Sequence, residues 1–473
     1  MTSASVLDIF KRITRIPRES GHEEPMTAFL CEWAEAHALE FKKDSTGNVL
    51  ITKPASKGKE SARTLVLQAH QDMVCEKYDG FDFDFSKDPI PYEIEDGWMI
   101  AKNTTLGADD GIGIAACLAL LESDLPMGKI ECLFTISEET GMDGAIALND
   151  GFFSGKTLIN LDSEDEGQLF IGCSGGEHTD ALFKYSPEII AGGSKVLDLN
   201  IRGGIGGHSG DDINKHRANA VKLMGSFLAG KLSEKYQLIS LNGGGKSNAI
   251  ARECRAVVAT DNPQSFSEDF LAFGERIKTE YSTTEKDLVF EVAQGSAEKA
   301  ICSDVASALV KALNDCPHGV ERMSPDIEGL VQTSTNLAAV SMAGDGCIKV
   351  ATSQRSSVES ELDELVRKVS AVFSGAGAEV SSYSKYPGWK PDLNSDILKI
   401  CVESYRKLFA KDPLVLAIHA GLECGLFLEK FPDLDMISFG PTLRGVHAPG
   451  EKMELASLDK FVMLLEDVVC NFR

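Results

Sequence analysis

Short apolar runs and longer helical segments alternate along the first 175 residues. Runs at residues 64–69, 130–136 and 157–161 have the length and continuous apolar character of buried strands. Apolar stretches at residues 111–121 and 145–148 suit helices between these strands. This succession predicts an α/β fold whose sheet is largely parallel where crossover helices join its strands.

A further helix is expected near the N-terminus. Apolar side chains between Met26 and Ala34 recur at helical spacing. The preceding Ser20-Gly-His-Glu23 has the pattern of a capping box, in which a serine and a glutamate three residues later bind the free N–H groups of a helix start. We therefore expect this helix to begin directly after Ser20.

The pattern changes after residue 176 and changes back near residue 388. Between these points the strands are longer and more polar, as at residues 196–201, and helices such as 218–228 are interspersed, which suggests an α+β domain with mixed or antiparallel pairing. Buried-strand character returns at residues 414–418 and 436–439, before a terminal helix. Glycine and proline mark both junctions. The sequence thus predicts one α/β domain made of residues 1–176 and 388–473, interrupted by an inserted domain of residues 177–387.

Composition narrows the classes of function. The 473 residues are 43% hydrophobic and 25% charged, which is ordinary for a globular protein. A net charge of −25 argues against nucleic acid as a partner, because phosphates are held by clustered lysine and arginine. The longest uncharged apolar stretch, residues 111–121, is well short of the ~20 residues that cross a bilayer, so no membrane partner is expected.

The N-terminus and the cysteines point to the cytoplasm. Asp8, Lys11 and Arg12 interrupt the apolar residues before the core of a signal peptide can form. The 12 cysteines are scattered and include no C-x-x-C pair. They are expected to be small apolar residues of a reducing compartment, and not a disulfide framework or a thiolate zinc site.

Acidic and histidine residues follow the predicted strands. His70-Gln-Asp72, Glu138-Glu139 and Asp162 each come directly after an apolar run, and Asp109 lies in a glycine-flanked turn before a helix. In open α/β sheets, ligands bind outside the carboxyl ends of the strands. Singly these motifs have ordinary explanations, such as a surface turn or, for the Asp109 turn, a calcium loop. Their common placement at strand ends favours a metal site.

Histidine nitrogen and carboxylate oxygen are ligands of zinc, and also suit manganese and cobalt. Two zinc ions need about six ligand bonds, which five residues can provide if one carboxylate bridges. His70, Asp109, Glu139 and Asp162 supply four residues, and His447 in the C-terminal segment offers the fifth. Because successive strand-end side chains diverge, one residue of the Glu138-Glu139 pair can coordinate while the other takes a proton from water.

Four segments carry a more specific resemblance. Residues 65–72, 104–114, 137–145 and 158–176 resemble the di-zinc exopeptidases, a clan that includes carboxypeptidases, aminoacylases and dipeptidases. The sequences of these segments are most similar to those of the bacterial aminoacylhistidine dipeptidases, or peptidase D, which cleave β-alanyl-histidine and other Xaa-His dipeptides. The likeness extends from the N-terminus to Glu451, nearly the whole chain.

The resemblance implies a role for each residue of the site. It implies a first zinc on His70 and Asp162 and a second on Glu139 and His447, with Asp109 bridging metals about 3.5–4 Å apart.

The residues beside these ligands have implied roles as well. Asp72 would orient the His70 imidazole and Glu138 would be the general base. Many close relatives are expected to have Asn where this chain has Asp110, and an extra carboxylate there would tune metal affinity without altering the mechanism.

The inserted domain resembles the family's lid, which also implies a homodimer through that domain. Residues 202–210 superficially resemble a phosphate loop but lack its Lys-Ser/Thr ending, so nucleotide binding is not expected. By resemblance, His208 would stabilise the oxyanion. Asn248 and Arg252 are candidates for holding a substrate carboxylate, and a structural turn with a surface arginine explains them equally well.

In the returning segment, residues 418–425 resemble a substrate-pocket loop, which makes His419 and Glu423 candidates for substrate contact. The function expected from the whole sequence is a cytoplasmic di-zinc dipeptidase acting on small peptides. The alternatives are an aminoacylase or tripeptidase of the same clan, and a non-catalytic binding protein on the same scaffold.

Overall fold

The computed structural model spans the 473-residue chain and describes residues 1–344, 346–419 and 421–473. The chain divides into two compact units. Unit 1 consists of Met1–Gly172, Trp389–Ala417 and Leu422–Arg473. Unit 2 consists of Cys173–Gly388 and Ile418–Gly421, so His419, which the sequence assigned to the returning catalytic segment, is grouped with unit 2.

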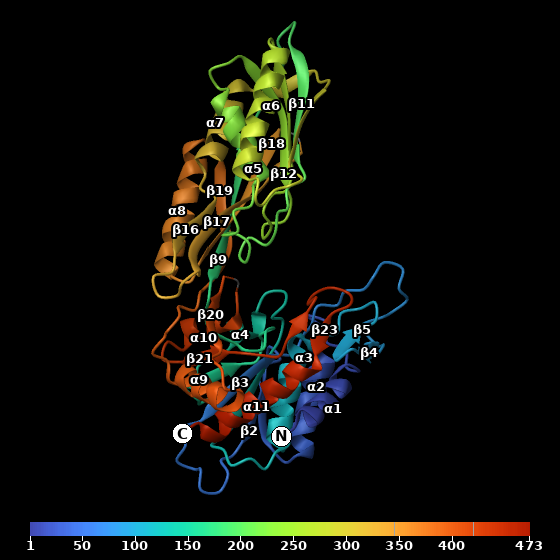
Figure 1. Ribbon diagram of the computed structural model, residues 1–473, viewed down its shortest axis with the longest axis vertical. Helices are drawn as coiled ribbons and strands as arrows, with labels where there is room; N and C mark the ends of the chain where they lie inside the picture. Colours follow the sequence, from blue (N-terminus) through green and yellow to red (C-terminus); the bar gives the residue numbers. More distant parts are fainter. Residues whose placement is uncertain (345, 420) are drawn as a thin grey trace. The chain divides into compact units, whose positions relative to one another are not determined.

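Unit 1 is built around a mixed sheet with the strand order β1-β2-β6-β3-β7-β21-β8-β20 (Figure 1). The strands that lie in or begin in unit 1 are β1 (Glu40–Lys43), β2 (Val49–Lys53), β3 (Leu65–His70), β4 (Tyr92–Glu95), β5 (Trp98–Ala101), β6 (Ile130–Thr135), β7 (Thr157–Asn160), β8 (Gln168–Cys173), β20 (Leu414–Ile418), β21 (Asp435–Ser438), β22 (Leu443–Arg444) and β23 (Lys452–Glu454). The central strands β6, β3, β7 and β21 pair in parallel, whereas β1, β2 and β8 pair antiparallel. Every residue of β3, β6 and β7 is buried, as in sheets covered on both faces. The predicted α/β class is confirmed.

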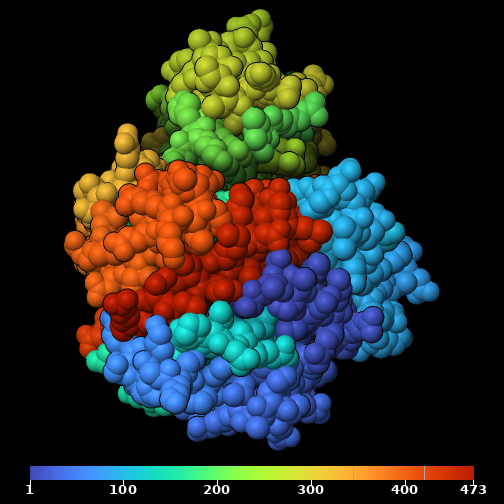
Figure 2. All heavy atoms as spheres, turned by 60° about the horizontal axis from the view of Figure 1, so that its bottom comes forward, coloured from blue at the N-terminus to red at the C-terminus, as the bar shows by residue number. Residues whose placement is uncertain are grey.

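The helices of unit 1 are α1 (Ser3–Ile13), α2 (Glu24–Ala36), α3 (Ala108–Glu122), α4 (Asp143–Ala147), α9 (Asp396–Phe409), α10 (Glu423–Lys430) and α11 (Leu455–Asn471). The predicted helix at residues 111–121 is α3, which is buried from Ala108 to Leu121 and packs against α1 and β3. The C-terminal helix α11 contacts α1 and α9. Figure 2 shows the two ends of the chain, blue and red, side by side on one face of unit 1.

The expected capping box before α2 is wrong. Glu23 itself is the residue before the helix, and its side chain makes no capping hydrogen bond. Ser20 instead donates from its hydroxyl to Asp72 over 2.7 Å. The polar side chains of this segment therefore bind other loops and not the helix that follows.

Unit 2 contains a nine-stranded sheet in which every described pairing is antiparallel. Its strands and the two-stranded sheet beside them are β9 (Gly175–Lys184), β10 (Pro187–Ile189), β11 (Lys195–Arg202), β12 (Tyr236–Gly244), β13 (Cys254–Thr260), β14 (Val289–Gln294), β15 (Lys299–Ile301), β16 (Gly319–Met323), β17 (Val331–Met342), β18 (Cys347–Ser356) and β19 (Glu379–Tyr386). Its helices are α5 (Ala220–Gly230), α6 (Pro263–Glu280), α7 (Ser303–Asp315) and α8 (Glu359–Gly375).

The helices of unit 2 form its apolar core with the sheet. Along β11, Leu197, Leu199 and Ile201 are buried in that core, while the residues between them are only partly buried. This period of two is typical of a sheet with helices on one face. In the described part of the chain, no helix combines the length and the apolar character that crossing a membrane requires.

Candidate metal centre

The potential ligands of unit 1 meet where parallel strands end. His70 is the last residue of β3 and is in register with Thr135, the last residue of β6. Glu138 and Glu139 follow β6, and Asp162 follows β7. The topology alone therefore brings these side chains to one edge of the sheet, as the sequence predicted.

Two further candidate ligands approach this edge from outside the sheet. Asp109 lies in the first turn of α3, and His447 lies between β22 and β23. One carboxylate oxygen of Asp109 is 2.9 Å from Nε2 of His70, and the other is 3.2 Å from Nε2 of His447. Nε2 of His447 is also 2.8 Å from Oε2 of Glu139, and Nε2 of His70 is 3.7 Å from Oδ1 of Asp162. Asp109 thus lies between two histidine–carboxylate pairs.

The chemistry of this donor set fits metal ions. Oε1 of Glu139 and Oδ2 of Asp110 are buried, and no hydrogen-bond partner is found for either among the described residues. Ligand atoms of His70, Asp109 and Glu139 lie within 4.8 Å of one another, and so do those of His70, Asp110 and Asp162. Burying several carboxylates together is costly unless cations compensate them. Nitrogen and oxygen donors of this kind suit zinc, manganese and cobalt.

The pKa values follow from this concentration of negative charge. Burial, together with Asp109, raises the pKa of Asp162 well above its usual value. Although burial opposes it, Asp162, Asp109 and Asp72 raise the pKa of His70 well above its usual value. Hydrogen bonds with Asp109 and Glu139 raise the pKa of His447 to about 11. Metals and protons compete for donors of this kind, so metal binding is expected to release protons.

Asp72 connects the His70 loop to the Glu138-Glu139 turn. Its Oδ1 is 3.3 Å from Nδ1 of His70, the ring nitrogen that faces away from Asp109. The same oxygen accepts a hydrogen bond from the backbone N–H of Glu138 over 3.1 Å, and Oδ2 of Asp72 accepts one from the N–H of Glu139 over 3.2 Å. A fully buried carboxylate in this position can fix both the imidazole and the turn.

Comparison with known proteins identifies the family of the chain. Residues 66–471 match Peptidase family M20/M25/M40. The chain belongs to this family. It is therefore a metallopeptidase, a hydrolase of peptide bonds, and the cluster of histidines and carboxylates is its candidate metal centre.

Relatives resemble the chain over nearly its full length. It is 38% identical over 467 residues to the cytosol non-specific dipeptidase of Escherichia coli (strain K12), covering 98% of this chain and 96% of the relative. Among solved structures, aminoacylhistidine dipeptidase from Vibrio alginolyticus has a TM-score of 0.93 and 39% identity, with 99% of this chain and 97% of that chain covered. Aminopeptidase PepT from Bacillus cereus shares the fold, with a TM-score of 0.58 and 16% identity over 99% of this chain and 98% of that chain.

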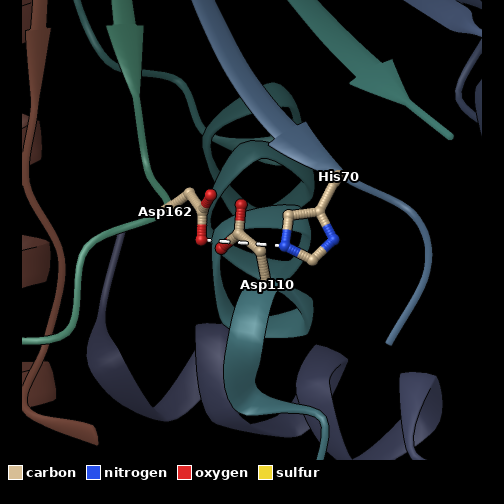
Figure 3. Close-up of side chains that lie close together, drawn as sticks. All are labelled: His70, Asp110 and Asp162. Atoms are coloured by element: carbon tan, nitrogen blue, oxygen red, sulfur yellow. Dashed lines mark ion pairs between the residues drawn. The ribbon is translucent and has the colours of Figure 1, made fainter. Parts of the chain in front are cut away.

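Asp110 lies among the candidate ligands, beside His70 and Asp162. Figure 3 shows it between His70 and Asp162, the two side chains expected to share a metal. Its Oδ1 accepts a hydrogen bond from the backbone N–H of Gly113 over 3.1 Å. Burial, together with Asp109, raises the pKa of Asp110 well above its usual value. The geometry therefore makes Asp110 a close neighbour of the candidate metal centre.

Glu423 has a different environment from the substrate contact that the sequence predicted. It is fully buried at the start of α10, and its Oε2 accepts hydrogen bonds from Gln68 over 2.6 Å and from Thr135 over 2.8 Å. Burial raises its pKa to about 7. Because Gln68 lies two residues before His70 on β3, Glu423 is hydrogen-bonded to the strand that carries a candidate ligand.

The candidates in unit 2 lie on and beside its glycine-rich loop. Residues 208 and 249 form an isolated β-bridge, and the N–H of Ser209 donates to the carbonyl of Asn248, so His208 and Asn248 are neighbours. Asn248 and Arg252 are exposed. His419 is buried with its Nε2 2.7 Å from Oγ of Ser334, and burial lowers its pKa to about 3.

Two charged residues near the centre were missed by sequence reasoning. Arg18 is buried and donates to the backbone carbonyls of Gln71, Asp72 and Gly107. Glu451 is buried and accepts three hydrogen bonds, from the backbone N–H groups of residues 106–108, at 2.7, 3.0 and 2.8 Å. Arg18 thus binds the backbone of both loops that carry His70 and Asp109, and Glu451 binds the backbone of the Asp109 loop. The one available signal was that Glu451 lies four residues after His447, since a lone arginine or glutamate has no pattern of its own.

Proposed function

We propose that the protein is a cytoplasmic dipeptidase that hydrolyses small peptides, with a preference for Xaa-His substrates such as β-alanyl-histidine. The names of two relatives support this proposal, since one is a cytosol non-specific dipeptidase and the other an aminoacylhistidine dipeptidase, and each matches nearly the whole chain. The two names differ in breadth, so the preference for histidine is the finer part of the proposal.

The observation that carries the proposal is the position of Asp109, with one carboxylate oxygen toward His70 and the other toward His447. We assign His70 and Asp162 to one zinc, Glu139 and His447 to a second, and Asp109 to both. Manganese or cobalt would suit the same donors.

When bound, a pair of such ions polarises the peptide carbonyl and makes water acidic enough to lose a proton near neutral pH. The chain's own residues transfer the proton and orient the ligands. Glu138 accepts a proton from the attacking water and passes it to the leaving amine. Asp72 holds the His70 ring in the orientation that points Nε2 toward the metal ligands.

For unit 2 the proposal rests on the resemblance of its motifs. We assign His208 to stabilisation of the oxyanion, Asn248 and Arg252 to a substrate carboxylate, and His419 to the substrate pocket. We also propose a homodimer formed through residues 177–387, which sedimentation of the purified protein tests.

The experiment is a substrate panel with the zinc-loaded protein and its Glu138→Ala variant. The panel contains β-alanyl-histidine, dipeptides without histidine, tripeptides and N-acetyl amino acids. The proposal expects hydrolysis of dipeptides, fastest for Xaa-His, with loss of nearly all activity in the variant. Faster cleavage of tripeptides or N-acetyl amino acids would instead indicate the tripeptidase or aminoacylase, and a variant that kept most activity would remove Glu138 from its role.

A further inference from the structure

One segment of unit 1, residues 18–23, contacts three of the loops that carry candidate ligands, those of His70, Asp109 and Glu139. Arg18 binds the carbonyls of Gln71, Asp72 and Gly107, and Ser20 donates to Asp72. Glu23 reaches the third loop, the turn that contains Glu138 and Glu139. Because the side chains of this segment do not cap α2, their contacts need another explanation.

Glu23 is 5% exposed, and one of its carboxylate oxygens, Oε1, accepts hydrogen bonds from backbone and hydroxyl donors. Oε1 accepts hydrogen bonds from the N–H of Ser137 over 3.0 Å, from the hydroxyl of Ser137 over 3.1 Å and from the N–H of Gly21 over 2.9 Å. A buried carboxylate that receives three such bonds is a strong and directional anchor. Two of these three bonds come from Ser137.

Ser137 needs such an anchor because of its backbone. Its φ is 54°, in the left-handed region that a residue with a Cβ seldom adopts. Its own carbonyl accepts bonds from the N–H groups of Gly141 and Met142, which close the turn on its other side. Non-glycine residues keep this conformation only where their surroundings enforce it.

The next two residues repeat the arrangement with a different carboxylate. The N–H groups of Glu138 and Glu139 donate to Asp72, so three successive N–H groups point to two buried carboxylates. The side chains of Glu138 and Glu139 are thus attached to a stretch of backbone that these hydrogen bonds hold in place. Their directions therefore depend on how firmly the backbone of Ser137 is held.

We propose that Glu23 is a positioning residue, which holds Ser137 in the left-handed conformation and so fixes the direction of Glu138. The proposal rests on the proposed function of Glu138 as general base. Glu23 itself contacts neither substrate nor metal in this account, and it acts only through the turn.

The test measures kcat and KM for the zinc-loaded protein with a dipeptide substrate. The variants are Glu23→Ala, the milder Glu23→Gln, and Glu24→Ala as a matched control, since Glu24 is the exposed neighbour of the same residue type. A misplaced catalytic group costs up to about 100-fold in rate, so we expect Glu23→Ala to lower kcat by at least about 10-fold with KM changed by less than about threefold. Glu23→Gln should fall between Glu23→Ala and the wild type, and Glu24→Ala should match the wild type.

A second substitution separates positioning from loss of structure. Glycine adopts positive φ freely, so Ser137→Gly should raise the kcat of Glu23→Ala by about fivefold and should not raise that of the wild type. This non-additive result is expected only if Glu23 acts through the backbone of Ser137. The proposal is overturned if Glu23→Ala and Glu24→Ala have the same kcat, or if Ser137→Gly has the same effect in both backgrounds.

A further measurement distinguishes failure of the general-base role of Glu138 from failure of the anchoring by Glu23. Hydrogen exchange of the peptide that contains residues 136–142, followed by mass spectrometry on the metal-free protein, should be faster in Glu23→Ala than in Glu24→Ala. If Glu138→Ala keeps its activity while this exchange difference is present, the role of Glu138 is wrong and the anchoring of the turn by Glu23 stands. Equal exchange in the two variants would overturn the anchoring itself.

Discussion

Two histidines in unit 1 and two in unit 2 have opposite environments. His70 and His447 lie among carboxylates that raise their pKa values. His318 and His419 are held by neutral partners, and burial lowers their pKa values to about 4 and about 3, with the nearby cations Lys222 and Arg355 acting in the same direction. In unit 1 the surroundings of the imidazole favour positive charge, whereas in unit 2 they favour the neutral ring.

This difference locates the chemistry. A bound metal cation is stabilised by negative charge around it. Within residues 1–344, 346–419 and 421–473, the clusters of histidine and carboxylates that could hold a metal are found only where β3, β6 and β7 end beside the start of α3. In unit 2, His419 pairs with a serine hydroxyl, and the exposed Asn248 and Arg252 suit recognition more than metal binding. We therefore expect perturbation of the unit 1 cluster to remove the reaction, and perturbation of unit 2, apart from the proposed oxyanion residue His208, to alter binding or stability.

The largest effect should come from removing the metal. Dialysis against a chelator should abolish peptide hydrolysis, and addition of zinc, manganese or cobalt should restore it. The metal-free protein should also unfold at a lower temperature, because a ligand that binds the folded state stabilises it. Thermal unfolding with and without zinc measures this shift, and an unchanged midpoint would contradict a metal site in the folded chain.

Adjacent aspartates offer a sharper contrast. Asp109→Asn should lower kcat/KM by about 100-fold or more, because the amide cannot supply charge to two metals. Asp110→Asn should cost less than about 10-fold, because its Oδ1 is engaged with the N–H of Gly113 and the assigned ligand set does not include it. Kinetics and metal content of both variants test this order. A larger loss for Asp110→Asn would make Asp110 a ligand in place of its neighbour.

The neutral histidines of unit 2 should make stability depend on pH. His318 has a folded pKa of about 4 against about 6.5 when unfolded, so the unfolded chain takes up a proton first as the pH falls. The stabilisation from neutral, buried His318 is complete above pH ~6.5 and is lost as the pH falls toward 4. At pH 5 the loss in unfolding free energy is about 2 kcal/mol. His318→Asn should therefore flatten the decrease in unfolding free energy between pH 7 and 5, measured with urea. An equally steep decrease in the variant would remove His318 from this role.

The smallest effects should come from the exposed residues of unit 2. Asn248→Ala and Arg252→Ala should each change stability by less than about 0.5 kcal/mol, as is usual for surface substitutions. If they hold a substrate carboxylate, KM should rise several-fold while kcat stays nearly constant. Steady-state kinetics with a dipeptide decide the matter, and an unchanged KM would leave these two residues as an ordinary turn.

Much of the site could be predicted because it follows the order of the strands. The apolar runs identified β3, β6 and β7, and parallel strands bring the residues after them to one edge of a sheet. His70, Glu139 and Asp162 needed no further information to be placed together.

Other parts of the site depend on contacts between distant segments. Glu23 lies 114 residues from Ser137, and the bonds from residues 106–108 to Glu451 span more than 340 residues. No local pattern specifies such pairs, and the local pattern of Ser20 and Glu23 pointed to a helix cap instead. For Glu423, the sequence gave no sign of its two bonds to β3 and β6, because Gln68 and Thr135 lie more than 280 residues away along the chain.

The central claim is that Asp109 joins two metal ions at the strand ends of unit 1. Crystals of the zinc-loaded protein, measured at the zinc absorption edge, test it most directly. We expect two anomalous peaks about 3.5–4 Å apart, one beside His70 and Asp162 and the other beside Glu139 and His447, with Asp109 contacting both. A single peak, or two peaks without Asp109 between them, would contradict it.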